Sequence, residues 1–230
     1  RTHEHGVRRE LRTVPAEKVS RSDIIRSQRE IINLGYFNPE NLDIQTPVNP
    51  QRGTVDINYV LEERPSDQLE LSAGWGGFQR VIGTLGVTFN NFSLRNLFNR
   101  EAWSPLPMGD GQRFSLRAQT NGDFYQSYNI SLTEPWLGGR KPNSLTVGGF
   151  FNRFGFGQRN TASYQTFKIT QFSASLGTRL KWPDDNFISS TAINLQTLDL
   201  NNWTSGLFSD AEGNRVTQGT YFNYSLKQTI

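Results

Sequence analysis

The repeating pattern of apolar residues changes near Asp67, and this change limits the chain to a fold of two unlike parts. Before it, the stretch from Arg8 to Phe37 is rich in charge and has apolar residues at helical spacing. After it, apolar and polar residues alternate along many short segments, which is the two-residue period of β-strands. We therefore predict a small module with helices, followed by a long run of strands.

The first part carries the sequence signals of two helices. A first short helix is expected to place Val7 and Leu11 on one face. Ser20 is expected to cap a second helix, with Asp23 in a short variant of the capping box, and Gly35 suits its C-terminal end. The predicted apolar stripe of this second helix consists of Ile24, Gln28, Ile31 and Ile32.

Two strands are predicted after these helices, at Leu42 to Gln45 and at Gly53 to Glu62. In the second of them apolar and polar residues alternate, which indicates a strand with one buried face. The order helix, helix, strand, strand makes a thin α+β sheet that a further strand before Arg1 would complete. We therefore assign residues 1–66 to one α+β domain whose first strand is missing.

Residues 67–230 are predicted to form about eight antiparallel strands. The first of them shows the pattern plainly, because Leu69, Leu71, Ala73 and Trp75 share one face. Alternating segments of about 9–15 residues have the length of tilted transmembrane strands. A soluble β-sandwich produces a similar pattern, because each of its sheets also has one apolar and one polar face.

The connections between the strands favour a membrane barrel over a sandwich. Short turns that contain Trp136 and Trp182 alternate with longer polar loops, predicted at Arg153–Thr166 and Asn201–Val216. Such alternation is expected when turns lie on one side of a membrane and loops on the other. The two tryptophans then fall where interfacial aromatic residues are found. Tryptophans in an ordinary soluble β-core are the alternative interpretation.

Composition narrows the classes of protein further. The chain has no cysteine, which excludes disulfides, thiolate metal sites and cysteine nucleophiles. It has no run of about 18 apolar residues, so a helical membrane protein is not expected. The net charge is +3 with basic and acidic residues interleaved, so nucleic acid is not an expected partner. No signal peptide is recognised, and the chain is interpreted as a fragment whose export signal lay upstream.

The residues that could carry chemistry do not form a catalytic or metal-binding pattern. His3 and His5 lack acidic or thiol partners at ligand spacing and are expected to be exposed. The acidic pairs Glu62-Glu63 and Asp184-Asp185 are expected in solvated positions at a strand end and in a turn. The stretch Gly74 to Gly77 precedes no helix, so weak strand pairing is favoured over phosphate binding. We expect no cofactor, no metal and no enzymatic activity.

Seven segments of the chain are similar to parts of one known family: Val7–Arg12, Ile25–Glu30, Asn33–Phe37, Val55–Ile57 with Val60–Arg64, Leu71–Gly76, Asn90–Phe92 and Thr133–Trp136. In these segments the chain resembles the BamA-type outer-membrane protein assembly factors. The first three are similar to the last POTRA domain of the family, and the fourth to the end of that domain. The glycine-rich segment resembles the family's first barrel strand, and the last two resemble strand ends. The resemblance implies a POTRA domain followed by the N-terminal half of a β-barrel in residues 67–230.

The chain departs from the family pattern in several respects. BamA-type barrels have sixteen strands, against about eight predicted here, and the family's arginine-containing lumen motif is not seen. The chain also stops at Ile230 without the terminal aromatic residue of a finished barrel. The connection Asn91 to Gln112 is long for a periplasmic turn, and it contains Leu94, Leu97, Phe98 and Trp103. It is expected to form a structured element against the barrel base or a partner.

The resemblance implies a location in the outer membrane, with the POTRA domain in the periplasm. It also implies that the chain inserts client β-barrels by pairing their strands at a lateral seam. The seam strand would comprise Leu69, Leu71, Ser72, Ala73, Gly74 and Trp75. Implied partners are unfolded outer-membrane proteins, outer-membrane lipid and accessory lipoproteins, for which Glu10 is the candidate contact. The alternatives are two-partner secretion or another POTRA-barrel translocation pore, and an outer-membrane enzyme whose active site lies elsewhere in a longer protein.

Overall fold

The chain forms two compact units in the computed structural model, which describes residues 2–76, 80–103, 106–139, 141–180, 182, 187–204, 208–209 and 212–230. The first unit contains residues 1–67 together with 89–112, and the second contains 68–88 together with 113–230. Gly77 and the acidic pair Asp184-Asp185, both considered in the sequence, lie outside the described residues.

Two helices of the first unit, α1 (Glu4–Arg8) and α2 (Arg21–Leu34), lie in the two regions where helices were predicted, but α1 ends before Leu11, which was expected on its apolar face. Gly35 ends α2 in the left-handed conformation at φ 82°, as its sequence position indicated. The predicted capping by Ser20 is wrong, because its hydroxyl contacts Ser22 Oγ at 2.7 Å and caps no backbone N–H. Within the described ranges, no helix is both long and apolar enough to cross a membrane.

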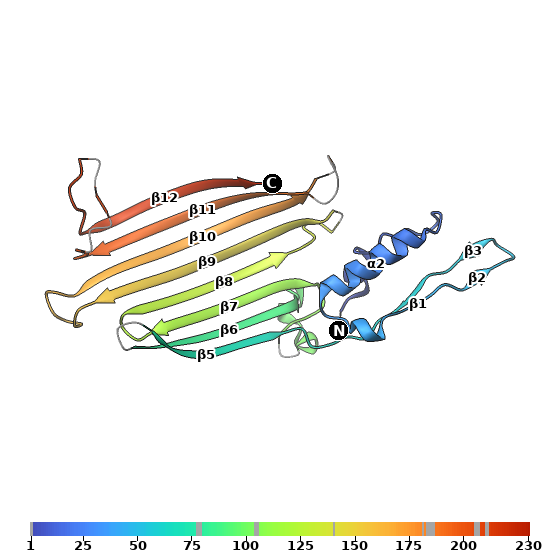
Figure 1. Ribbon diagram of the computed structural model, residues 1–230, viewed down its shortest axis with the longest axis horizontal. Helices are drawn as coiled ribbons and strands as arrows, with labels where there is room; N and C mark the ends of the chain where they lie inside the picture. The colour runs from blue at the N-terminus through green and yellow to red at the C-terminus, as the bar shows by residue number, and fades with distance from the viewer. Residues whose placement is uncertain are drawn as a thin grey trace. The chain divides into compact units, whose positions relative to one another are not determined.

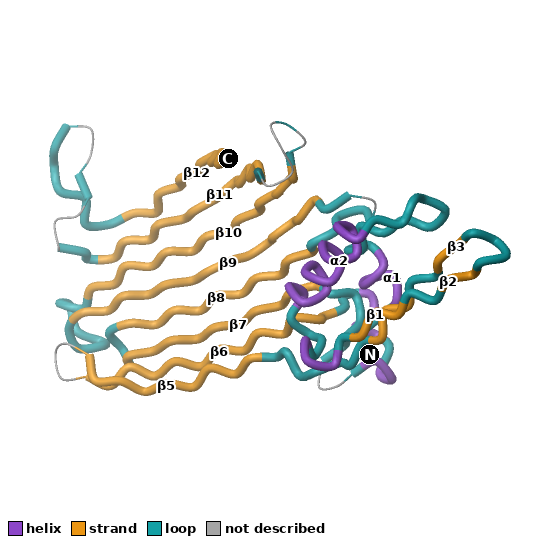
Figure 2. Tube along the Cα trace, turned by 45° about the vertical axis from the view of Figure 1, so that its right-hand side comes forward, coloured by secondary structure: helices purple, strands orange, loops and turns teal. Residues whose placement is uncertain are grey.

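Four short strands follow α2 and the short 3₁₀ helix η1 (Pro39–Asn41): β1 (Asp43–Gln45), β2 (Val48–Asn49), β3 (Thr54–Val55) and β4 (Asn58–Val60). They form one arm, in which β1 pairs with β4 and β2 pairs with β3 (Figure 2). The single strand predicted from Gly53 to Glu62 is therefore wrong, because the chain leaves regular pairing at Asp56 and Ile57. The alternation within it is confirmed, since Val55, Ile57, Tyr59 and Leu61 are partly buried and their neighbours are exposed.

The core of the first unit lies between α1, α2 and the arm. Its buried residues are Ile31, Tyr36 and Phe37, against which Val7, Leu11, Leu34, Leu42, Tyr59 and Leu61 pack. Ser27 is also fully buried, and its Oγ accepts a 2.8 Å hydrogen bond from the backbone N–H of Arg12. Ile32, which the predicted stripe included, is 36% exposed. The buried face of α2 is thus rotated towards Ser27 and is more polar than predicted.

The second unit is built on eight antiparallel strands in sequence order (Figure 1). They are β5 (Gln68–Gly76), β6 (Arg80–Phe92), β7 (Gln112–Asn121), β8 (Tyr125–Glu134), β9 (Asn143–Phe156), β10 (Gln165–Arg179), β11 (Ile188–Asn201) and β12 (Gly219–Thr229). The ends of β6 and β7 that face each other across their connection belong to the first unit. The predicted eight antiparallel strands are confirmed, with β5 and β12 at the two ends of the order.

The strand register collects apolar side chains on one face of this sheet. One cross-strand row runs from β7 to β12 through Leu116, Ile130, Gly149, Phe172, Leu195 and Tyr224. The adjacent row has the opposite character and runs through Ser115, Ser131, Gly148, Ser173, Asn194 and Ser225. Because alternate residues of a strand point to opposite faces, the sheet has one apolar and one polar face.

Two connections differ from the predicted long polar loops. β9 continues to Phe156 and β10 begins at Gln165, so the loop predicted at Arg153–Thr166 is shortened to residues 157–164. The connection after β11 carries Trp203, which is 4% exposed and packs with Phe167 and Leu200. The loop predicted at Asn201–Val216 is therefore partly folded onto the sheet through aromatic contacts.

Candidate functional site

The strand β5 stands at the edge of the sheet order and has one strand neighbour, β6, in the described part of the chain. Nine antiparallel register pairs join them, from Gln68 opposite Thr88 to Gly76 opposite Arg80. A strand with one paired side presents backbone N–H and C=O groups along its other side. These groups can form a ladder with a further strand.

The residues predicted for the seam all lie on β5. Leu69, Leu71 and Trp75 share its apolar face and are 72%, 79% and 76% exposed. Ala73 shares this face, whereas Ser72 and Gly74 point to the opposite one. A Cβ atom placed on Gly74 would meet no other atom within 4 Å. Side-chain packing therefore contributes little at this position, and backbone pairing with β6 carries the attachment.

One ion pair adds to this attachment on the polar face. Glu70 of β5 lies opposite Gly86 of β6, and its carboxylate reaches across that glycine to Arg117 of β7. The Arg117 Nη2 to Glu70 Oε1 distance is 3.0 Å, and both side chains are about half exposed. Gly86 permits this contact, because a Cβ there would come within 3.1 Å of the Glu70 carboxylate. The pair connects the edge strand to the third strand of the sheet.

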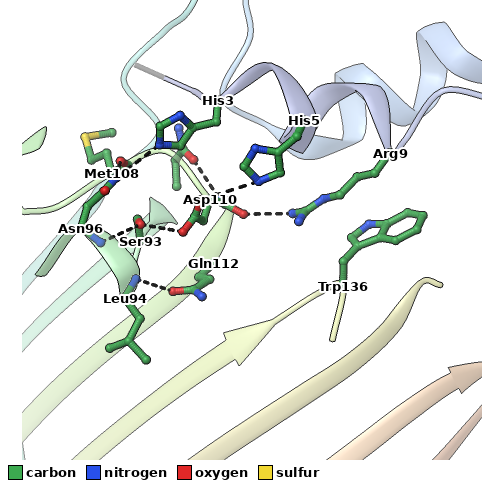
Figure 3. A network of polar contacts seen from close by, with 12 residues as sticks. His3, His5, Arg9, Ser93, Leu94, Asn96, Met108, Asp110, Gln112 and Trp136 are labelled. Carbon is green, nitrogen blue, oxygen red and sulfur yellow. Dashed lines mark hydrogen bonds and ion pairs between the residues drawn. The ribbon is translucent and has the colours of Figure 1, made fainter. Parts of the chain in front are cut away.

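A second candidate site is a cluster in the first unit that we call the polar network. It consists of Thr2 and Asn91, which bond to each other, together with His3, His5, Arg9, Ser93, Asn96, Asp110 and Gln112, which Figure 3 labels. Its members come from the first residues of the chain, from the connection between β6 and β7 and from the adjoining ends of these two strands. This connection contains two short 3₁₀ helices, η3 (Arg95–Phe98) and η4 (Arg100–Ala102).

Asp110 lies at the centre of the polar network and is 6% exposed. Its carboxylate accepts a 2.7 Å hydrogen bond from Ser93 Oγ and lies 3.7 Å from His5 Nε2. Its backbone carbonyl accepts a 3.0 Å hydrogen bond from Arg9. A buried carboxylate needs such partners, because transfer from water without them is costly. Asp110 therefore ties α1 and its flanking residues to the β6–β7 connection.

Asn91 makes a second set of hydrogen bonds in the polar network. Its side chain donates to Thr2 Oγ1 at 2.8 Å and accepts from the backbone N–H of Gly111 at 2.9 Å. Backbone bonds from His3 to the Gly109 carbonyl and from Gly109 to the Asn91 carbonyl complete the contact. Sequence reasoning missed these residues, since no periodicity connects polar groups that lie far apart in the chain.

Glu10, the candidate contact for an accessory lipoprotein, lies just after α1 rather than within it. Its side chain is 15% exposed, and its Oε1 is 3.7 Å from Arg9 Nε. The Glu10 side chain is therefore largely shielded from solvent and lies beside an arginine. Burial raises the pKa of the neighbouring Tyr36 to about 12, with Arg9 lowering it and Glu10 raising it further. Glu10 thus belongs to the electrostatic environment of the core.

The remaining predicted site residues lie in turns at one end of the sheet. Trp136 is half-buried in the connection between β8 and β9, and Trp182 is 84% exposed between β10 and β11. Because the strands are antiparallel and consecutive, these connections leave the sheet at the same end as the β6–β7 connection. His3 and His5 are exposed as predicted and stack on each other with 5.6 Å between ring centroids. In the described ranges, no group of three His, Asp or Glu side chains has the arrangement of a metal site.

An α+β module followed by a sheet with one apolar and one polar face is the architecture of outer-membrane β-barrel proteins with POTRA domains. The POTRA family pattern, described as a surface antigen variable number repeat, matches residues 1–64. The Omp85 superfamily domain matches residues 108–229. The chain belongs to the Omp85 superfamily. Its barrel strands are located in the outer membrane, and its POTRA domain lies in the periplasm.

Known relatives agree with this assignment. Over 140 residues the chain is 32% identical to the outer membrane protein assembly factor BamA of Neisseria meningitidis serogroup B. This match covers 60% of the chain and 15% of that relative, so the chain spans a minor part of its length. The predicted resemblance to BamA-type proteins is confirmed.

Two solved structures have a similar fold. BamA from Haemophilus ducreyi lacking POTRA domains 1–3 matches with a TM-score of 0.61 and 18% identity, over 98% of this chain and 40% of that chain. CdiB from Acinetobacter baumannii matches with a TM-score of 0.52 and 14% identity, over 86% of this chain and 35% of that chain. At these low sequence identities, the two matches show a similar fold and nothing further about this chain.

Proposed function

We propose that this chain is part of a factor that assembles β-barrel proteins in the outer membrane, and that β5 is the strand at which clients pair. The observation that carries the proposal is the position of β5 at the end of the strand order, with one side unpaired in the described chain. The similarity to a protein named as an assembly factor supports it. The role is non-enzymatic, because it requires only the exchange of backbone hydrogen bonds.

The physical basis is the closure of a barrel. A closed barrel leaves no strand edge, so β5 must meet another strand along a seam. Backbone hydrogen bonds at this seam can be replaced by those of an incoming client strand, as in other cases of strand addition. Side-chain packing contributes little at Gly74. Glycine within a strand also lowers stability by about 0.5–1 kcal/mol relative to alanine. The strand can therefore change partners at a modest cost in free energy.

The test is disulfide cross-linking between single cysteines, which the absence of cysteine from this chain makes specific. It uses the full-length protein and a client that carries single cysteines along its last strand. Ser72→Cys places a thiol on the edge strand. Ser131→Cys is the matched control, since Ser131 is paired on both sides, with Ser115 and Gly148. During client insertion we expect disulfides from position 72 to a fixed client register and few from position 131. Equal cross-linking at both positions would refute pairing at β5.

The same pair of variants separates assembly from secretion, the alternative that the fold of CdiB also permits. Ser72 and Ser131 lie on the polar face, which is the lumen face of a barrel. A polypeptide that moves through the lumen would pass both positions and would show no fixed register. A disulfide from position 72 to the facing strand of the same barrel would lock the seam and gives a second distinction. The locked seam would stop insertion by strand exchange but leave transport through the lumen intact.

The proposed partners are unfolded outer-membrane proteins, outer-membrane lipid and accessory lipoproteins, with Glu10 as the candidate lipoprotein contact. Glu10→Lys would place a second cation beside Arg9 within the module, so it tests folding and binding together. Glu10→Gln retains the shape of the side chain and removes its charge. We expect reduced co-purification of the lipoprotein with Glu10→Gln while the module remains folded. Unchanged co-purification would remove Glu10 from the contact surface.

A further inference from the structure

The β6–β7 connection has an unusual distribution of polar and apolar side chains. Most buried side chains in and beside it are polar, since Ser93 is fully buried and Asp110 and Gln112 are 6% and 7% exposed, and Pro107 is the fully buried apolar residue among them. Four of its large apolar residues are exposed instead, with Phe98 at 93%, Leu94 at 49%, Trp103 at 42% and Leu97 at 38%. Soluble proteins usually bury aromatic and aliphatic side chains and expose polar ones. This segment has the reverse arrangement.

The polar network explains how the connection is ordered while four of its large apolar side chains are exposed. Leu94 N–H donates to Gln112 Oε1 at 2.7 Å, and Asn96 donates to the Met108 carbonyl at 3.0 Å. The backbone of Phe92 forms a bridge with Met108, and that of Trp103 forms one with Pro107. The side chain of Leu94 points away from the network (Figure 3). Polar contacts thus hold the backbone, and the apolar side chains remain available to another surface.

We propose that the stretch Leu94 to Trp103, which we call the interfacial segment, binds the head-group region of the periplasmic leaflet of the outer membrane. The chain itself limits how far this segment can lie from the bilayer. It is joined directly to the ends of β6 and β7, two adjacent membrane strands. Phe98 follows the last residue of β6 by six positions, a reach of at most about 20 Å. The bilayer surface at the ends of these two strands is therefore within reach of the segment.

The composition of the interfacial segment fits this surface. Leu, Phe and Trp on one side with arginine nearby are typical of elements that lie in the plane of a membrane interface. The segment contains two arginines, Arg95 and Arg100, and one glutamate, Glu101, so its basic side chains outnumber its acidic ones. Guanidinium groups bind phosphates of lipid head groups through charge-assisted hydrogen bonds. Trp136 and Trp182, in connections at the same end of the sheet, are of the residue type enriched at such interfaces.

The test measures the environment of single labels in the full-length protein, folded into vesicles of phosphatidylethanolamine and phosphatidylglycerol. A polarity-sensitive fluorophore is attached at Phe98→Cys and, as a second site, at Leu94→Cys. Val48→Cys is the control in the same unit, since Val48 is exposed on β2, and Leu176→Cys is the control on the apolar face of β10. Quenchers are aqueous iodide and lipids with a spin label near the head group or deep in the acyl chains.

We expect the labels at positions 98 and 94 to be quenched most by the shallow spin label and little by iodide. The label at position 48 should be quenched by iodide alone, and that at position 176 by the deep spin label. Quenching of both segment labels by iodide to the extent seen at position 48 would overturn the proposal. Protection from iodide without quenching by either lipid would also overturn it, because the segment would then contact protein. The result depends on membrane location and not on assembly activity.

Discussion

The replacement Gly111→Ala tests how tightly the polar network fixes the first unit. Gly111 has a left-handed backbone conformation at φ 72°, which costs an L-residue about 1–2 kcal/mol. A Cβ there would also come within 2.9 Å of Tyr36 Oη and 3.0 Å of Arg9 Nη2. Moving these side chains off their rotamers costs about 0.5–1.5 kcal/mol. Loss of the Arg9 hydrogen bond to Asp110 adds about 0.5–1.5 kcal/mol.

These terms predict that Gly111→Ala destabilises the first unit by about 2–5 kcal/mol, if they are additive. The matched control is Gly35→Ala, because Gly35 has φ 82° but no atom within 4 Å of an added Cβ. The control should therefore cost the backbone term alone, about 1–2 kcal/mol. The assay is amide hydrogen exchange of α2 in the folded full-length protein, which reports opening of the core around Ile31. If Gly111→Ala reduces protection no more than Gly35→Ala, the crowding argument is refuted.

Three further predictions concern single contacts. The pKa of Tyr36 in the folded protein is about 12, above its ordinary value of 10.0. The tyrosine therefore contributes stability that is present below pH 10 and is lost as the pH rises through 12. Tyr36→Phe should flatten this part of a plot of unfolding free energy against pH. A double-mutant cycle with Glu70→Gln and Arg117→Gln, measured by amide exchange of β5, should give a coupling free energy of about 0.2–1 kcal/mol. This coupling should disappear in high salt, and a salt-independent value would contradict an exposed ion pair. Ser27→Ala should cost about 0.5–1.5 kcal/mol in α2 protection, since it removes the serine hydroxyl that accepts from the part-buried backbone N–H of Arg12, and a neutral result would mean that another group replaces the serine.

The strands could be predicted from the sequence because their signal is local. The two-residue period of Leu69, Leu71 and Trp75 survives in the structure, and so does the eight-strand order. The ends of the strands cannot be read from the sequence where the alternation weakens. Arg153 and Gly155 interrupt the apolar alternation of β9, although both residues remain paired with β10. Backbone pairing continues there because it does not depend on the side chain.

The polar network could not be predicted for a different physical reason. Ser93 and Asp110 are buried because they bond to each other, and neither residue type signals burial in a sequence. Trp203 is a similar case, because its place in a long connection suggested solvent and its partners Phe167 and Leu200 lie on strands. In both cases the decisive contact joins distant parts of the chain. The seam residues were assigned by resemblance, and their position on an edge strand leaves their role a prediction.

The discontinuous make-up of the first unit has a consequence for the order of folding. Asn91 bonds to Thr2 across 89 positions of sequence, so the N-terminal module acquires these contacts only after β5 and β6 have been synthesised and exported. Contacts between such distant residues form slowly, because a long loop must close before they contribute. An excised module that ended at residue 67 would lack Asn91, Gly109 and Asp110, which bond to Thr2, His3 and Arg9. Maturation of the periplasmic module is thus coupled in time to the formation of the first barrel strands.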